Sequence, residues 1–223
     1  MPNEIIFLVH TLAIVGAMLA SLGLGQSALV AFIVLQCVLA NLFVLKQITI
    51  FGLSATCADA FTIGATLGLN LLQEYFGREI TKKTIYINFF ALIFCAIIPQ
   101  IHLWYTPSSF DTTQGAFSLL LTPMPRIIIA SFIAFFISQN VDYLLYGFLR
   151  RIWTHKWLVA RNYASLSVSQ LVDTILFSIL GLSGLVSNIG HVILVSYLIK
   201  LIAIAVGTPL VALSRSFSIP GRR

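Results

Sequence analysis

The chain alternates between long apolar runs and short polar connections. The runs lie near residues 5–24, 27–45, 57–77, 84–104, 124–149, 164–187 and 190–213. Each approaches the roughly 20 residues that an α-helix, rising about 1.5 Å per residue, needs to cross a hydrocarbon core of about 30 Å. The pattern predicts an all-α integral membrane protein, a polytopic bundle of about seven transmembrane helices that forms one domain over residues 1–223.

Two stretches break the helical pattern. Residues 46–54 alternate like a β-strand and end near Gly52. Because lipid offers no partners to unpaired backbone groups, we expect either an interfacial loop or a segment shielded by protein. Residues 105–123 contain Pro107, Gly115 and Pro123, and we expect them to form the one long exposed loop.

Composition supports the membrane interpretation. Hydrophobic residues make up 59% of the chain and charged residues only 9%, against about 25% in soluble domains. The net charge is +6, but the basic residues lie mostly between the apolar runs, which favours the positive-inside rule over nucleic-acid binding. The basic segments 78–83, 150–161 and 215–223 are then cytoplasmic, as is the C-terminus, and the protein is multi-pass.

Several kinds of chemistry are not expected. Cys37, Cys57 and Cys95 are too far apart for a CxxC site, the histidines lack metal-ligand spacing, and no phosphate-binding P-loop is present. We therefore expect no cofactor, no metal and no enzymatic activity, and the oligomeric state stays open, with a homo-oligomer among the alternatives. Glu4 is the only charged side chain before the first run, which favours a retained helix over a cleaved signal peptide.

Polar residues inside the run 57–77 indicate a structural or functional role, since inserting a charged side chain at mid-bilayer costs at least about 2.5–3.5 kcal/mol of free energy. Asp59, Asn70 and Glu74 share one helical face. Two alternatives stay open: Asp59 could be a helix N-cap, and Glu74 could pair with the arginine four residues later. Gly64 and Gly68 form a GxxxG pair that predicts close helix packing.

The two following polar clusters repeat one motif. Gln139 and Asp142 share a face in the run 124–149, and Gln170 and Asp173 do so in the oppositely directed run 164–187. Inverted repeats of this kind frame binding sites in transporters. With Glu74, these acids are expected to converge at a similar depth. Asp142 could instead be interfacial, and Asp173 could be an acid paired only for structure.

Two further residues, Lys200 and Phe177, join the candidate site. Lys200 lies in the middle of the last run, where it could snorkel to the interface, but an ion pair with one of the buried acids is the better interpretation. Carboxylates and amides suit a planar solute with N–H donors and C=O acceptors, on which Phe177 could stack. Arg126 is expected to anchor the outer interface.

These residues carry a resemblance to a known family. The motifs are Asn70-x-x-x-Glu74-Tyr-x-Gly77, Ser-Gln-x-x-Asp in the run 124–149, and Arg161-Asn162 followed by Ser169-Gln170-x-x-Asp173-Thr-x-x-Phe177. Over about residues 30–213 the chain resembles the queuosine-precursor transporter family, also described as vitamin-uptake-like transporters. The family pattern has Asp where this chain has Asn70, which removes a charge there. The first helix looks like an addition to the family's six-helix core.

The resemblance implies import of a 7-deazaguanine (7-cyano-7-deazaguanine, 7-aminomethyl-7-deazaguanine or queuine) across a bacterial inner membrane, for salvage into queuosine of tRNA. Arg161 and Asn162 could instead organise the cytoplasmic end of their helix. The residues expected to bind the solute are Asn70, Glu74, Gln139, Asp142, Gln170, Asp173, Phe177, Arg161, Asn162 and Lys200.

Two other functional classes compete with a standalone transporter. A substrate-binding membrane subunit of an ATP-driven vitamin uptake complex would need a docking groove of small residues, and such residues are not concentrated beyond the run 57–77. An intramembrane enzyme would need a nucleophile–base pair or a metal set, and no such set stands out.

Overall fold

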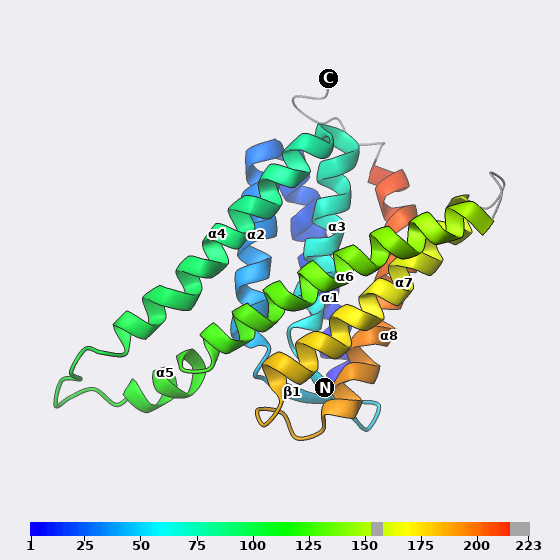
Figure 1. Cartoon of the computed structure of the whole chain (residues 1–223). Helices are drawn as coiled ribbons and strands as arrows, with labels where there is room; N and C mark the ends of the chain where they lie inside the picture. The colour runs from blue at the N-terminus through cyan, green and yellow to red at the C-terminus, as the bar shows by residue number, and fades with distance from the viewer. Residues whose placement is uncertain (153–157, 215–223) are drawn as a thin grey trace.

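The computed structural model describes the backbone of residues 1–152 and 158–214 and the side chains of residues 1–149, 151–152 and 163–205. Its elements are α1 (Asn3–Gly23), α2 (Gln26–Phe43), β1 (Gln47–Ile50), β2 (Leu53–Thr56), α3 (Asp59–Phe76), α4 (Arg78–His102), α5 (Gln114–Leu121), α6 (Met124–Ile152), α7 (Leu158–Phe177), a π-helical segment Ser178–Leu182, and α8 (Ile189–Ser214) (Figure 1). The all-α polytopic bundle is confirmed. Within the described residues, five helices are long and apolar enough to cross a membrane by length and composition.

The long helices run back and forth between the two ends of the bundle. The α3–α4 junction, the end of α6, the start of α7 and the end of α8 lie at one end, while the N-terminus and the hairpin lie at the other (Figure 1). The basic residues Arg78, Lys82 and Lys83 therefore lie on the first turns of α4 at the first of these ends, which we call the basic end. The loops predicted there are shorter than expected, because α4 begins at Arg78 and α6 continues to Ile152.

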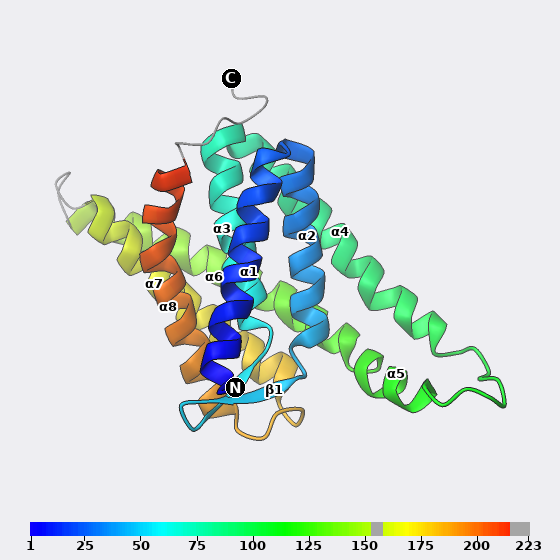
Figure 2. The ribbon, with the colours of Figure 1, turned by 180° about the vertical axis from the view of Figure 1, so that it is seen from behind.

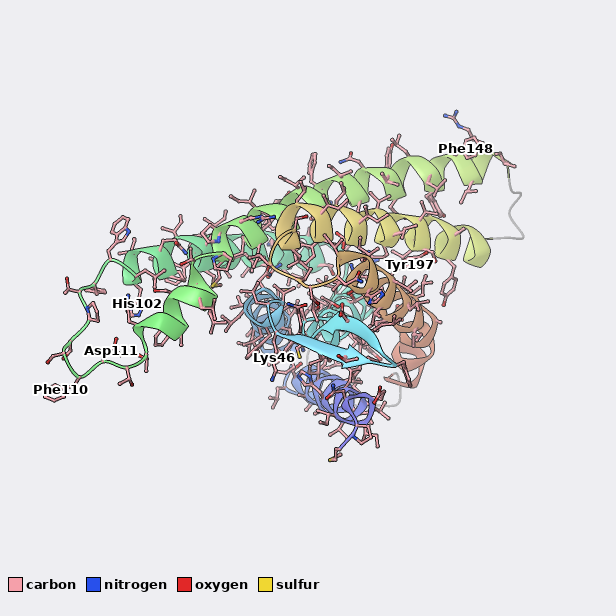
Figure 3. The ribbon with its side chains drawn as sticks, turned by 90° about the horizontal axis from the view of Figure 1, so that it is seen from below. Lys46, His102, Phe110, Asp111, Phe148 and Tyr197 are labelled. Carbon is pink, nitrogen blue, oxygen red and sulfur yellow. The ribbon has the colours of Figure 1, made fainter. Side chains whose placement is uncertain are left out.

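Residues 46–54 belong to a β-hairpin. β1 and β2 pair antiparallel with Ile50 opposite Leu53, and Phe51 and Gly52 both have positive φ, which matches the tight turn preferred by two-residue hairpin loops. The hairpin lies across one end of the bundle (Figure 3). The Gln47 side chain accepts hydrogen bonds of 2.8 Å from the backbone N–H and the hydroxyl of Ser187. The segment is therefore held by protein.

The predicted loop 105–123 is partly wrong. Helix α5 occupies Gln114–Leu121, and only the chain before it projects as a loop, with Phe110 and Asp111 near its tip (Figure 3). Glycine in the first turn and proline after the last turn are both compatible with a short helix, which is why Gly115 and Pro123 did not break it.

The predicted GxxxG packing is confirmed. A Cβ on Gly64 would collide with Gln36 and Ile14, and one on Gly68 would lie 2.6 Å from Cγ1 of Ile33. Helix α3 can therefore approach α1 and α2 closely, and the three helices pack together (Figure 2).

Helices α6 and α7 run antiparallel and side by side (Figures 1 and 2), and both carry small buried residues. Ala134 and Ser138 of α6 and Ser165 and Ser169 of α7 are all buried. In contrast, large apolar side chains such as Phe90 of α4 and Phe136 of α6 are exposed. Such a distribution is typical of a protein whose outer surface meets lipid.

Candidate functional site

A cavity of about 120 Å³ lies where six segments of the bundle meet. Its volume is below the roughly 300–1,000 Å³ of pockets for drug-sized ligands, so it suits a compact solute. Its walls come from α2, the end of β2, α3, α6, α7 with the following π-helical segment, and α8. The polar lining residues are Asn41, Thr56, Asp59, Thr62, Ser131, Asp173, Thr174, Ser178, Ser196 and Lys200.

Asp59 brings a deeply buried carboxylate to this cavity, with only 4% of the residue exposed. The N-cap of α3 is Ala58 and makes no side-chain capping bond, so the capping role considered for Asp59 is wrong. Instead, Oδ2 of Asp59 accepts a hydrogen bond of 2.9 Å from the Ser196 hydroxyl and one of 3.4 Å from Thr56. Asp59 thereby links the start of α3 to α8.

Lys200 forms the predicted ion pair with a buried acid, and the structure identifies this acid as Asp173. Nζ of Lys200 lies 2.6 Å from Oδ2 of Asp173, with side-chain exposures of 18% and 22%. Because both side chains point into the cavity from different helices, the snorkelling alternative for Lys200 is wrong. A partly buried pair of this kind persists only when the geometry is good, since both charges are taken out of water.

The wall next to Phe177 is a π-helical segment, Ser178–Leu182, in which Ser178 is buried. Such segments leave backbone carbonyls without their usual helical partners and are frequent at functional sites. Arg126 donates hydrogen bonds of 2.9 and 2.8 Å to the carbonyls of Leu180 and Ser183. The residue expected to be an interface anchor therefore also fixes the end of the cavity wall.

A second, smaller cavity of about 40 Å³ adjoins the first. Gln170, Thr62 and Lys200 line it, and Thr62 and Lys200 also line the larger cavity. Gln170 precedes Asp173 by about one turn of α7, on the side toward the basic end. Gln170 therefore lies next to the candidate site, in the direction of the basic end.

The structure brings only part of the predicted site together. Asp173, Phe177 and Lys200 line the larger cavity, whereas Asn70 and Glu74 are exposed on α3 and line neither cavity. Glu74 follows Asp59 by fifteen residues, about 22 Å along the helix at its usual rise. The expected convergence of Glu74 with Asp173 at one depth is therefore not found.

The remaining predicted residues lie on α6 and α7. Gln139 is exposed and Asp142 is half-buried, and neither lines the two cavities. Oδ1 of Asp142 is buried and has no hydrogen-bond partner among the described residues. The side chains of Arg161 and Asn162 lie outside the described residues.

Sequence reasoning missed the part of the site formed by uncharged polar side chains, most of them hydroxyls. Ser196 precedes Lys200 by four residues and therefore shares its face of α8, a spacing visible in the sequence. Asn41, Thr56 and Ser131 come from other segments, and no local pattern connects them to Asp173. The folded arrangement was needed to find them.

The arrangement suits binding rather than bond breaking. Two carboxylates can accept hydrogen bonds, the Lys200 ammonium can donate them, and Phe177 offers a flat apolar face. Within the described residues, no group of three metal-ligating side chains lies together. A compact polar solute with both donors and acceptors would satisfy this lining.

A family described as "Putative vitamin uptake transporter" matches residues 56–214, which contain most of the cavity lining. The chain belongs to this transporter family. It is 30% identical over 190 residues to a Bacillus subtilis (strain 168) protein named "Probable queuosine precursor transporter", covering 84% of this chain and 83% of that protein. No solved structure matches. Membership supports a multi-pass membrane transporter of a small molecule rather than an enzyme.

Proposed function

We propose that the protein imports a queuosine precursor, a 7-deazaguanine base, and binds it in the cavity between Asp59, Asp173 and Lys200. The observation that carries the proposal is the lining of the cavity, in which carboxylates and an ammonium group lie beside an aromatic ring. A deazaguanine has N–H donors and a C=O acceptor on one planar ring system, so it complements this lining.

The ion pair suggests how the base is held. Asp173 uses Oδ2 for Lys200 and keeps Oδ1 to accept an N–H of the base. The Lys200 ammonium has three donors, so it can keep Asp173 and still reach the carbonyl of the base. Phe177 would stack on the ring plane.

The other predicted contacts belong to a different stage of transport. Gln170 lies beside the cavity toward the basic end, and Gln139, Asp142, Asn70, Glu74, Arg161 and Asn162 would meet the solute only after the helices move. Movement of one part of a bundle against another around a fixed site is the usual form of alternating access. We place the basic end and the C-terminus in the cytoplasm of a bacterium and the protein in its inner membrane.

Uptake by cells tests the proposal. The chain is expressed alone in bacteria that lack both deazaguanine synthesis and uptake, each base is supplied, and queuosine is measured in tRNA. We expect queuosine with at least one base, and loss of it with Asp173→Ala while the variant remains in the membrane. Asp111→Ala, in the exposed loop, is the matched control and should keep wild-type uptake.

The same assay separates the alternative function. A substrate-binding subunit of an ATP-driven vitamin uptake complex would bind a base but deliver none without its partner. Binding by the purified chain together with no queuosine in the cells would favour that alternative. Neither binding nor uptake of any base would contradict the proposed solute class.

A further inference from the structure

The cavity contains a carboxylate that forms no ion pair with a described side chain. Asp59 receives hydrogen bonds from two hydroxyl groups, those of Ser196 and Thr56. Among the described side chains, Lys82 pairs with Glu79 and Lys200 pairs with Asp173, and none forms an ion pair with Asp59. Lys200, the one cation among the described lining residues, is paired with Asp173.

The described lining therefore has one negative charge in excess when its groups are ionised. It contains two carboxylates, Asp59 and Asp173, and one ammonium group, Lys200. A buried carboxylate with hydrogen bonds but no countercharge is costly, and a positively charged group that enters the cavity removes that cost. A positively charged ligand would balance this excess charge.

Resting on the proposed function, we propose that Asp59 is the counter-ion that selects a positively charged deazaguanine, the 7-aminomethyl base, over the neutral 7-cyano base. The aminomethyl group is a primary amine, which is protonated at neutral pH as a lysine side chain is. It lies on the opposite side of the ring system from the amidine-like N–H edge. One carboxylate of the cavity can therefore hold each end of the solute, Asp173 the edge and Asp59 the ammonium group.

The size of the preference follows from the kind of bond. A hydrogen bond to a charged group contributes more than one between neutral groups, and an ammonium–carboxylate contact with a carboxylate as buried as Asp59 should favour the cation by about 10- to 100-fold. The nitrile of the 7-cyano base has no proton to donate to Asp59. The preference between the 7-aminomethyl and 7-cyano bases therefore measures the contribution of Asp59.

The experiment compares the two bases on the full-length protein in proteoliposomes. Labelled 7-aminomethyl-7-deazaguanine is taken up in competition with each unlabelled base, and the ratio of inhibition constants is measured for wild type, Asp59→Asn, Asp59→Glu and Asp111→Asn. The wild type should favour the aminomethyl base by about 10- to 100-fold. Asp59→Asn should bring the ratio close to one, and Asp59→Glu should retain a preference for the cation. The loop variant Asp111→Asn should keep the wild-type ratio.

Every outcome decides between the alternatives. Equal inhibition by the two bases in the wild type overturns the inference without any variant, so a folding failure of Asp59→Asn does not protect it. An unchanged preference in Asp59→Asn also overturns it, because the ratio then does not depend on the charge of Asp59. If neither base is transported or bound by wild type, the proposed function itself fails and the inference falls with it.

Discussion

Removing one partner of the Lys200–Asp173 pair should destabilise the folded protein as well as stop transport. The two charged atoms lie 2.6 Å apart, and about a fifth of each side chain is exposed. Loss of one partner from a buried pair leaves an uncompensated charge and costs about 3–5 kcal/mol. The remaining exposure places Lys200→Gln and Asp173→Asn near the lower end, about 3 kcal/mol each.

The double variant separates the interaction energy of the Lys200–Asp173 pair from the effects of the two single substitutions. Asp173→Asn with Lys200→Gln leaves two neutral amides that can hydrogen-bond across the same gap, so it should be more stable than the sum of the single changes predicts. For residues in direct contact, the expected coupling is about 0.5–3 kcal/mol. Uptake should be lost in the double variant even where stability returns, because the charges that hold the solute are gone.

Thermal unfolding of the purified protein in detergent measures the effect. For a chain of 223 residues, about 3 kcal/mol corresponds to a fall in melting temperature of about 6–12 °C. Lys82→Gln is the matched control: its pair with Glu79 spans 3.3 Å with exposures of 53% and 80%, and such surface pairs contribute about 0–1 kcal/mol. Single variants as stable as wild type, or singles whose effects simply add, would refute the reasoning.

Three further variants test the surroundings of the cavity. Gly64→Ala should cost about 1–3 kcal/mol in unfolding free energy because its Cβ collides with neighbouring side chains, whereas Gly16→Ala, with open space around it, should cost nothing measurable; equal melting temperatures would contradict the packing. Arg126→Lys should weaken solute binding several-fold with a smaller loss of stability, since one ammonium group replaces the guanidinium hydrogen bonds to two carbonyls, and unchanged affinity in a binding titration would count against this role. Gln47→Ala should increase amide hydrogen exchange in the hairpin by releasing Ser187, and wild-type exchange rates would show that this contact does not hold the hairpin.

The sequence predicted the membrane helices well because a long apolar run has few stable structures other than a helix that spans the membrane. An ion pair for Lys200 was predictable because a lysine deep inside an apolar run needs an acidic partner, but only the structure identifies that partner as Asp173. The hairpin was visible only as an alternation, since its docking partners, such as Ser187, lie far away in the chain.

The part of the site around Asp59 could not be found from apolar runs and the charges within them. Asp59 was open to a local interpretation, because a polar residue at the start of a helix is commonly a cap. Its actual partner, Ser196, is 137 residues away. Helical periodicity places Asn70 and Glu74 on the face of α3 that also bears Asp59, but it does not tell at which depth along α3 the cavity lies.

Equilibrium binding of a deazaguanine to the purified protein tests the central claim most directly. The full-length protein in detergent is titrated with the 7-aminomethyl base, and the affinities of wild type, Asp173→Asn and Asp111→Asn are compared. We expect wild type and Asp111→Asn to bind equally, and Asp173→Asn to bind at least about 10-fold more weakly, because it loses a charge-assisted hydrogen bond inside the cavity. Equal affinity of Asp173→Asn and wild type would contradict the placement of the solute between Asp59, Asp173 and Lys200.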